Sequence, residues 1–90
     1  MYVVYSAPYG GWYLPAEVAE KLNVSRYTVN KEVRTSPVLI KYVRANPYGE
    51  LALARIPAEA TGWAVWEYDG AETVFYVLGG KIHTASREEV

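Results

Sequence analysis

The sequence has no cysteine and no glutamine, and it has one methionine and one histidine in 90 residues. The lack of cysteine excludes disulfides, thiolate metal sites and cysteine nucleophiles. No apolar run approaches the roughly 20 residues of a membrane-spanning helix, and the first residues lack the basic start and long apolar stretch of a secretory signal. We therefore expect a cytoplasmic, intracellular protein without a membrane partner.

The composition is rich in aromatic residues, with nine tyrosines, three tryptophans and one phenylalanine. A chain of this length has room for one small domain and one main core. The scarcity of glutamine, cysteine and methionine matches the depletion of thermolabile residues in hyperthermophile proteins, which suggests a thermophilic source.

The net charge of −1 hides an uneven distribution along the chain. Residues 1–20 carry −2, residues 21–55 carry +5 from seven basic and two acidic side chains, and residues 56–90 carry −4. A basic middle between acidic ends is a pattern that the isoelectric point of the whole chain does not report.

The first 23 residues predict a strand, a turn and a short helix. Residues 1–5 are β-branched and aromatic, and residues 8–11, Pro-Tyr-Gly-Gly, form a turn signal. Pro15 suits the first position of a helix, which we expect to end near Leu22. Asn23 follows, and asparagine tolerates the left-handed backbone of a tight turn.

A second helix is predicted from Arg26 to about Arg34, with the Ser25 hydroxyl as its N-cap. Four polar side chains would lie on one face of this helix at positions i, i+3, i+4 and i+7. They are Tyr27, Asn30, Lys31 and Arg34. Pro37 ends the helix, because the residue before a proline avoids the helical region.

Residues 38–45 and 50–56 are two β-prone runs around the turn Asn-Pro-Tyr-Gly at 46–49, which favours a hairpin over 38–56. The competing interpretation is a third helix with Pro37 at its first position. Val38, Ile40 and Val43 favour the strand.

A second hairpin is predicted over residues 63–84, with Asp69 and Gly70 at its turn. A two-residue loop would place Glu67 opposite Glu72, a repulsive pair, so we favour a four-residue loop that pairs Trp66 with Phe75. Gly79-Gly80 turns the chain once more, and Ser86 to Glu89 has the capping-box spacing of a helix start.

The segment 14–34, LPAEVAEKLNVSRYTVNKEVR, resembles a helix-turn-helix DNA-binding unit. Ala19 stands where the helices cross, Leu22, Val24 and Val29 stand at mini-core positions, and residues 23–25 stand where such units show Gly-Val-Ser. The residue pattern of this segment is most similar to that of the winged excisionase and MerR-like group. Residues 55–60 also look like the exit from the wing of that group.

This resemblance implies an α+β fold, a winged helix-turn-helix with an additional β-hairpin. The unit would span residues 14–35, the wing 38–56 and the aromatic C-terminal hairpin 63–84. The implied function is sequence-specific binding of double-stranded DNA by a homodimer, as a transcriptional regulator or a recombination accessory factor. The DNA-binding residues would be Ser25, Arg26, Tyr27, Asn30, Lys31, Arg34, Lys41 and Arg44.

The aromatic hairpin supports two alternatives, a protein–protein interaction module and a single-stranded nucleic-acid binder whose aromatics stack on bases. As part of the DNA-binding hypothesis, the hairpin would form the dimer interface with Trp63, Trp66, Phe75 and Tyr76. His83 has no second histidine or cysteine beside it, so we expect no metal site and no other cofactor. No nucleophile has a plausible triad partner, and we do not expect an enzyme.

Overall fold

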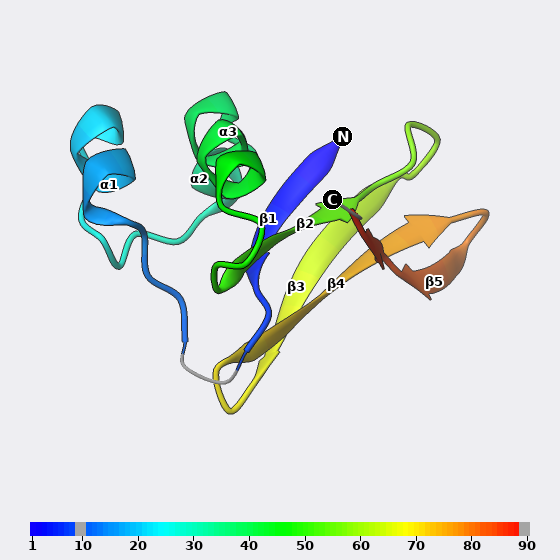
Figure 1. The fold of residues 1–90 in the computed structure, drawn as a ribbon. Coiled ribbons are helices and arrows are strands. Elements are labelled where there is room, and N and C mark those ends of the chain that lie inside the picture. The colour runs from blue at the N-terminus through cyan, green and yellow to red at the C-terminus, as the bar shows by residue number, and fades with distance from the viewer. Residues whose placement is uncertain (9–10, 89–90) are drawn as a thin grey trace.

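The computed structural model describes residues 1–8 and 11–88, in which the chain forms three short helices and six strands (Figure 1). The helices are α1 (Ala16–Leu22), α2 (Lys31–Arg34) and α3 (Pro37–Ala45). The strands are β1 (Tyr2–Ser6), β2 (Leu51–Arg55), β3 (Gly62–Tyr68), β4 (Ala71–Leu78), β5 (Lys81–Thr84) and β6 (Ser86–Arg87). Among the helices described, none is long and apolar enough to cross a membrane.

The strands form two antiparallel sheets that pack on each other. Sheet A has the order β1-β2-β6 and sheet B has the order β3-β4-β5. In Figure 1 the helices lie on one side of sheet A and sheet B lies on the other. Sheet A is therefore the middle layer of three.

Each face of sheet A contributes to its own core, because neighbouring residues of a strand point to opposite faces. Val4 and Leu53 face the helices and pack with Leu14, Val18 and Leu39. The opposite face meets sheet B with a smaller set of buried side chains, Val3, Ala54, Ile56 and Val74. β1 and β2 are thus covered on both sides, which explains their nearly continuous run of apolar residues.

The chain between β5 and β6 passes from one sheet to the other. The amide of Ala85 donates to the carbonyl of Val74 in β4 over 2.8 Å. Two residues later, Arg87 pairs with Ala54 in β2. This crossover joins the two sheets along one side.

The predicted winged helix-turn-helix fold is wrong, because the chain is a mixed α/β protein with more strand than helix. The second helix, expected from Arg26, begins only at Lys31 and has four residues. Its N-cap is Asn30, whose Oδ1 accepts from the Val33 amide over 2.8 Å. Ser25 does not cap this helix.

Tertiary hydrogen bonds hold the segment before α2 outside a helix. The carbonyl of Arg26 accepts from the Leu14 amide over 2.7 Å, and the carbonyl of Thr28 accepts from the Trp12 indole over 2.9 Å. In a helix that started at Arg26, these two carbonyls would accept hydrogen bonds from backbone amides one turn later in the same helix. The tertiary hydrogen bonds therefore replace the helical ones in this segment.

The predicted wing is also wrong, because residues 37–45 form α3 and not a strand. Pro37 occupies the start of this helix, and Leu39 and Val43, four residues apart, are both buried on one face. The competing third-helix interpretation is the right one. β2 pairs with β1 in place of the expected hairpin partner.

Several local predictions are confirmed. β1 and α1 lie where they were expected, and Asn23 ends α1 in the left-handed conformation at φ 55°. Gly79 and Gly80 form the turn between β4 and β5, both with positive φ. The turn signal at 8–11 falls partly on residues 9–10, which lie outside the described residues.

The C-terminal hairpin forms, but its loop is the two-residue one, with Asp69 at φ 52° and Gly70 at φ 84°. Glu67 therefore pairs with Glu72, and the favoured pairing of Trp66 with Phe75 is wrong. The two carboxylates avoid repulsion because each has its own partner. Glu67 accepts from the Gly70 amide, and Glu72 binds a buried arginine.

The helix predicted to start at Ser86 is replaced by β6, which covers Ser86–Arg87. Residue 89 of the expected capping box lies outside the described residues. The free edge of β2 accounts for the difference, because it supplies backbone partners for an extended chain.

Candidate interaction surfaces

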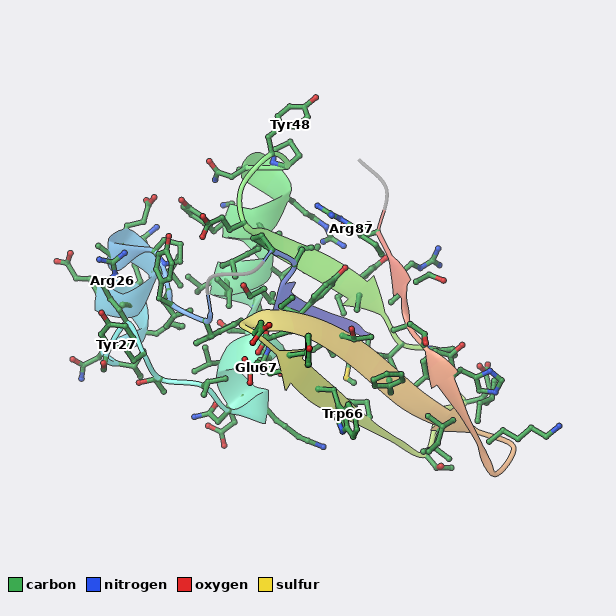
Figure 2. The ribbon with its side chains drawn as sticks, turned by 90° about the horizontal axis from the view of Figure 1, so that it is seen from below. Arg26, Tyr27, Tyr48, Trp66, Glu67 and Arg87 are labelled. Carbon is green, nitrogen blue, oxygen red and sulfur yellow. The ribbon has the colours of Figure 1, made fainter. Side chains whose placement is uncertain are left out.

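The residues predicted to read DNA do not form a single face. Figure 2 places Arg26 and Tyr27 beside α1, and Tyr27 is 78% exposed. The Ser25 hydroxyl accepts from the Tyr27 amide within a turn. Lys31 reaches across to sheet B, where its Nζ donates to the Trp63 carbonyl over 3.1 Å and lies 4.4 Å from the centre of the Trp63 ring.

The two residues predicted for the wing lie on α3. Lys41 is exposed. Arg44 binds Glu88 through Nε and Nη2, at 3.2 Å and 3.0 Å, and its guanidinium lies over the Tyr2 ring. The hydrogen bond from Arg44 is the main cause that lowers the pKa of Glu88, and the same bond raises the pKa of Arg44. Arg44 is therefore already partnered within the chain.

Arg34, the last of the four side chains predicted to share one face of the second helix, points into the protein. It forms two hydrogen bonds with Glu72, and its Nη1 also donates to the Val4 carbonyl over 3.1 Å. Its guanidinium stacks at 4.4 Å from the centre of the Trp12 ring. Glu72 accepts a further bond from the Ser6 amide over 2.7 Å. This network joins α2, β1 and β4, and it removes Arg34 from the surface.

Sheet B has one open side, here called the outer face. Strand alternation assigns to it Gly62, Ala64, Trp66, Tyr68, Ala71, Thr73, Phe75, Val77, Ile82 and Thr84. Trp66, Tyr68 and Ile82 are 74%, 75% and 74% exposed, and Trp66 meets Phe75 edge to face at 6.5 Å. Of the residues that the structure describes, none that alternation places on this face is charged.

The four residues predicted as a dimer interface divide between the two sides of sheet B. Trp66 and Phe75 belong to the outer face, and Trp66 projects from β3 in Figure 2. Trp63 and Tyr76 point inward, where both pack against the core between the sheets. His83 is stacked on Tyr76 at 5.3 Å.

The other candidate surface, here called the tyrosine groove, is an open groove of about 720 Å³ between α1, the end of α3 and the turn before β2. Tyr13, Tyr42 and Tyr48 line it, together with prolines and with polar side chains. These further residues are Pro15, Pro47, Ser6, Glu17, Arg26, Asn46 and Glu50. Tyr48 is fully exposed and stands beyond the end of α3 in Figure 2.

Tyr13 connects the polar groups of the tyrosine groove. Its hydroxyl donates to Glu50 Oε2 over 3.0 Å, and the Arg26 guanidinium lies 5.3 Å from its ring centre. The bond to Glu50 and the negative charge of that carboxylate raise the pKa of Tyr13. Arg26 Nε in turn donates to the Leu14 carbonyl over 2.9 Å.

Sequence reasoning missed both the buried ion pair and the tyrosine groove. The alternation of Glu72 with Val74 placed the carboxylate on the inner side of its strand, which is the one signal for a buried acid. The residues of the groove come from three separate segments, and no spacing along the chain relates them. Within residues 1–8 and 11–88, no group of three histidine, aspartate or glutamate side chains could hold a metal ion.

The outer face of sheet B and the tyrosine groove are the two candidate interaction surfaces of this chain. No protein-family model, no curated protein and no solved structure matches the chain.

Proposed function

We propose that this chain is a protein-interaction module that pairs with a second copy of itself through the outer face of sheet B. The high exposure of Trp66, Tyr68 and Ile82 on that uncharged face is the observation that carries the proposal. A contiguous apolar surface left open on a small protein is typical of a binding site.

The charge around this face favours a protein over a nucleic-acid strand. Single-strand binders combine stacked aromatics with cations that follow the phosphates. The residues described on the outer face include no cation. The β3–β4 hairpin at one end of it carries Glu67 and Asp69, and the β4–β5 turn at the other end carries the single cation Lys81. A phosphate backbone lying along Trp66 and Tyr68 would meet these acids.

A second copy is the partner that fits this face best. Two identical neutral faces can meet across a two-fold axis without burying an unpaired charge. The three strands have seven, eight and four residues, so at about 3.4 Å per residue and about 4.8 Å spacing they cover roughly 300 Å² before side-chain relief is added. A standard interface buries about 800 Å² per partner, so this contact is smaller than standard and the dimer is expected to be weak and transient.

Sedimentation velocity between about 10 µM and 500 µM tests the proposal, since a weak specific dimer dissociates within that range. We expect a concentration-dependent dimer for the native chain and a monomer for Trp66→Glu, which puts a carboxylate into the contact. Tyr27→Glu is the matched control, because Tyr27 is an equally exposed aromatic beside α1. A native chain that stays monomeric throughout, or a Trp66→Glu dimer, would overturn the proposal.

Sequence-specific binding of double-stranded DNA stays a prediction. Two control experiments distinguish nucleic-acid binding, to double or single strands, from self-association. In the first, a gel shift with duplex DNA of random sequence at low salt tests whether the exposed basic residues bind duplex. In the second, addition of oligothymidine tests whether bases stack on Trp66 and quench its fluorescence. Quenching by oligothymidine without a dimer would favour the nucleic-acid alternative.

A further inference from the structure

We propose that the tyrosine groove binds an extended peptide segment that carries a lysine or arginine side chain. The groove of about 720 Å³ lies within the usual range of ligand sites, roughly 300–1,000 Å³. It is open to solvent, which suits a length of chain better than a small molecule that must be enclosed. This site lies apart from the outer face of sheet B.

The walls of the groove are suited to a cation. Tyrosine rings attract ammonium and guanidinium groups through their negative faces. The contact of Arg26 with the Tyr13 ring shows one such pairing within the groove itself. Tyr48 is fully exposed, and its ring is available to a second cation.

The charges that face the groove also favour a cation. Glu17 and Glu50 line it, and the carbonyl end of α3 adds partial negative charge at Asn46. Arg26 is the opposing charge, and it is already in contact with the Leu14 carbonyl and the Tyr13 ring. Two carboxylates thus face one cation that already has partners.

The groove can also hold the backbone of an extended peptide. Pro15 and Pro47 present rigid apolar surface beside the tyrosines, and such aromatic and proline surfaces suit segments in the polyproline conformation. The Tyr48 hydroxyl can donate to a peptide carbonyl, and the Tyr13 hydroxyl can still accept from a peptide amide.

The probe is a capped pentapeptide Ala-Pro-Arg-Pro-Ala, and its control carries citrulline, a neutral isostere, in place of arginine. Binding is measured by backbone amide shifts in NMR titrations of the full chain. We expect saturable shifts around the groove, with a dissociation constant about tenfold higher for the citrulline peptide because the cation–aromatic and carboxylate contacts are lost.

Glu50→Gln and Tyr48→Ala are each expected to weaken binding of the arginine peptide by about fivefold to tenfold. Their matched controls are Glu59→Gln and Tyr27→Ala, which remove an exposed carboxylate and an exposed tyrosine outside the groove. Tyr48 is fully exposed, so its removal leaves the fold intact. Equal binding of both peptides, or shifts that avoid the groove, would overturn the inference.

Peptide binding in the tyrosine groove does not require self-association. The Trp66→Glu variant changes the outer face of sheet B alone and should bind the arginine peptide as tightly as the native chain does. Loss of the dimer with retained peptide binding would therefore support both proposals. Peptide binding by a native chain that is always monomeric would support the groove and contradict the dimer.

Discussion

Arg34 and Glu72 form a bidentate ion pair inside the molecule, with Nη2 of Arg34 2.7 Å from Oε2 of Glu72. Their side chains are 8% and 5% exposed. The pair lies where α2, β1 and β4 meet, and the Ser6 amide completes the coordination of the carboxylate. Because β4 belongs to sheet B and β1 to sheet A, this contact fixes the position of one sheet on the other.

Removing only the cation should be costly. Arg34→Met leaves the Glu72 carboxylate buried without its partner, and we expect the free energy of unfolding to fall by about 3–5 kcal/mol. Combining it with Glu72→Gln removes both charges and keeps an acceptor for the Ser6 amide, so most of the loss should be recovered. Urea denaturation of the single and double variants measures the difference. Equal instability of the two would show that the charge is not the cause.

Gly80 is predicted to be required for its backbone conformation alone. Its φ is 76°, and a Cβ added there would meet nothing within 4 Å. Gly80→Ala should therefore cost about 1 kcal/mol through backbone strain without any clash. Gly62→Ala is the control, since Gly62 has equal space and its φ is not positive. Thermal unfolding of both variants separates strain from crowding, and a loss at Gly62 as large as at Gly80 would contradict the explanation.

Glu88 should contribute to the pH dependence of stability. The hydrogen bond from Arg44 lowers the pKa of Glu88 below its ordinary value of 4.5 in the folded chain. A carboxyl with a lowered folded pKa stabilises the protein above its unfolded pKa, and this contribution disappears as the pH falls through the folded pKa. The native chain should thus exceed Glu88→Gln in stability at neutral pH and match it in strong acid. Unfolding curves between about pH 2 and pH 6 test this, and a constant difference across that range would contradict it.

The elements that depend on neighbouring residues could be predicted from the sequence. Asn23 ends α1 because a left-handed residue is needed where the helix stops, and Gly79-Gly80 turns the chain because both residues need positive φ. In such places the cause and the effect lie within a few residues. The four candidate dimer residues divide between the two sides of sheet B, and alternation along β3 is what separates Trp66 from Trp63.

The elements that depend on distant partners could not be predicted. Val38 and Ile40 favour a strand locally, but burial of Leu39 and Val43 against sheet A stabilises a helix in their place. The repulsion expected between Glu67 and Glu72 disappears because Arg34, 38 residues away along the chain, neutralises one of them. The winged-helix resemblance depended on a helix over residues 26–34. Distant donors, the Leu14 amide and the Trp12 indole, bind carbonyls in its first part and hold that part outside a helix.

The place of β2 in sheet A has a consequence for the order of folding. Its two neighbours are β1, at the start of the described chain, and β6, at residues 86–87, so both of its edges are filled by segments far away in sequence. The hairpins of sheet B close across two-residue turns and need no distant strand. Since closing long loops is slower than closing short ones, we expect assembly of sheet A to be the slow step of folding. We therefore expect the two hairpins of sheet B to pair before β1 and β2 join them.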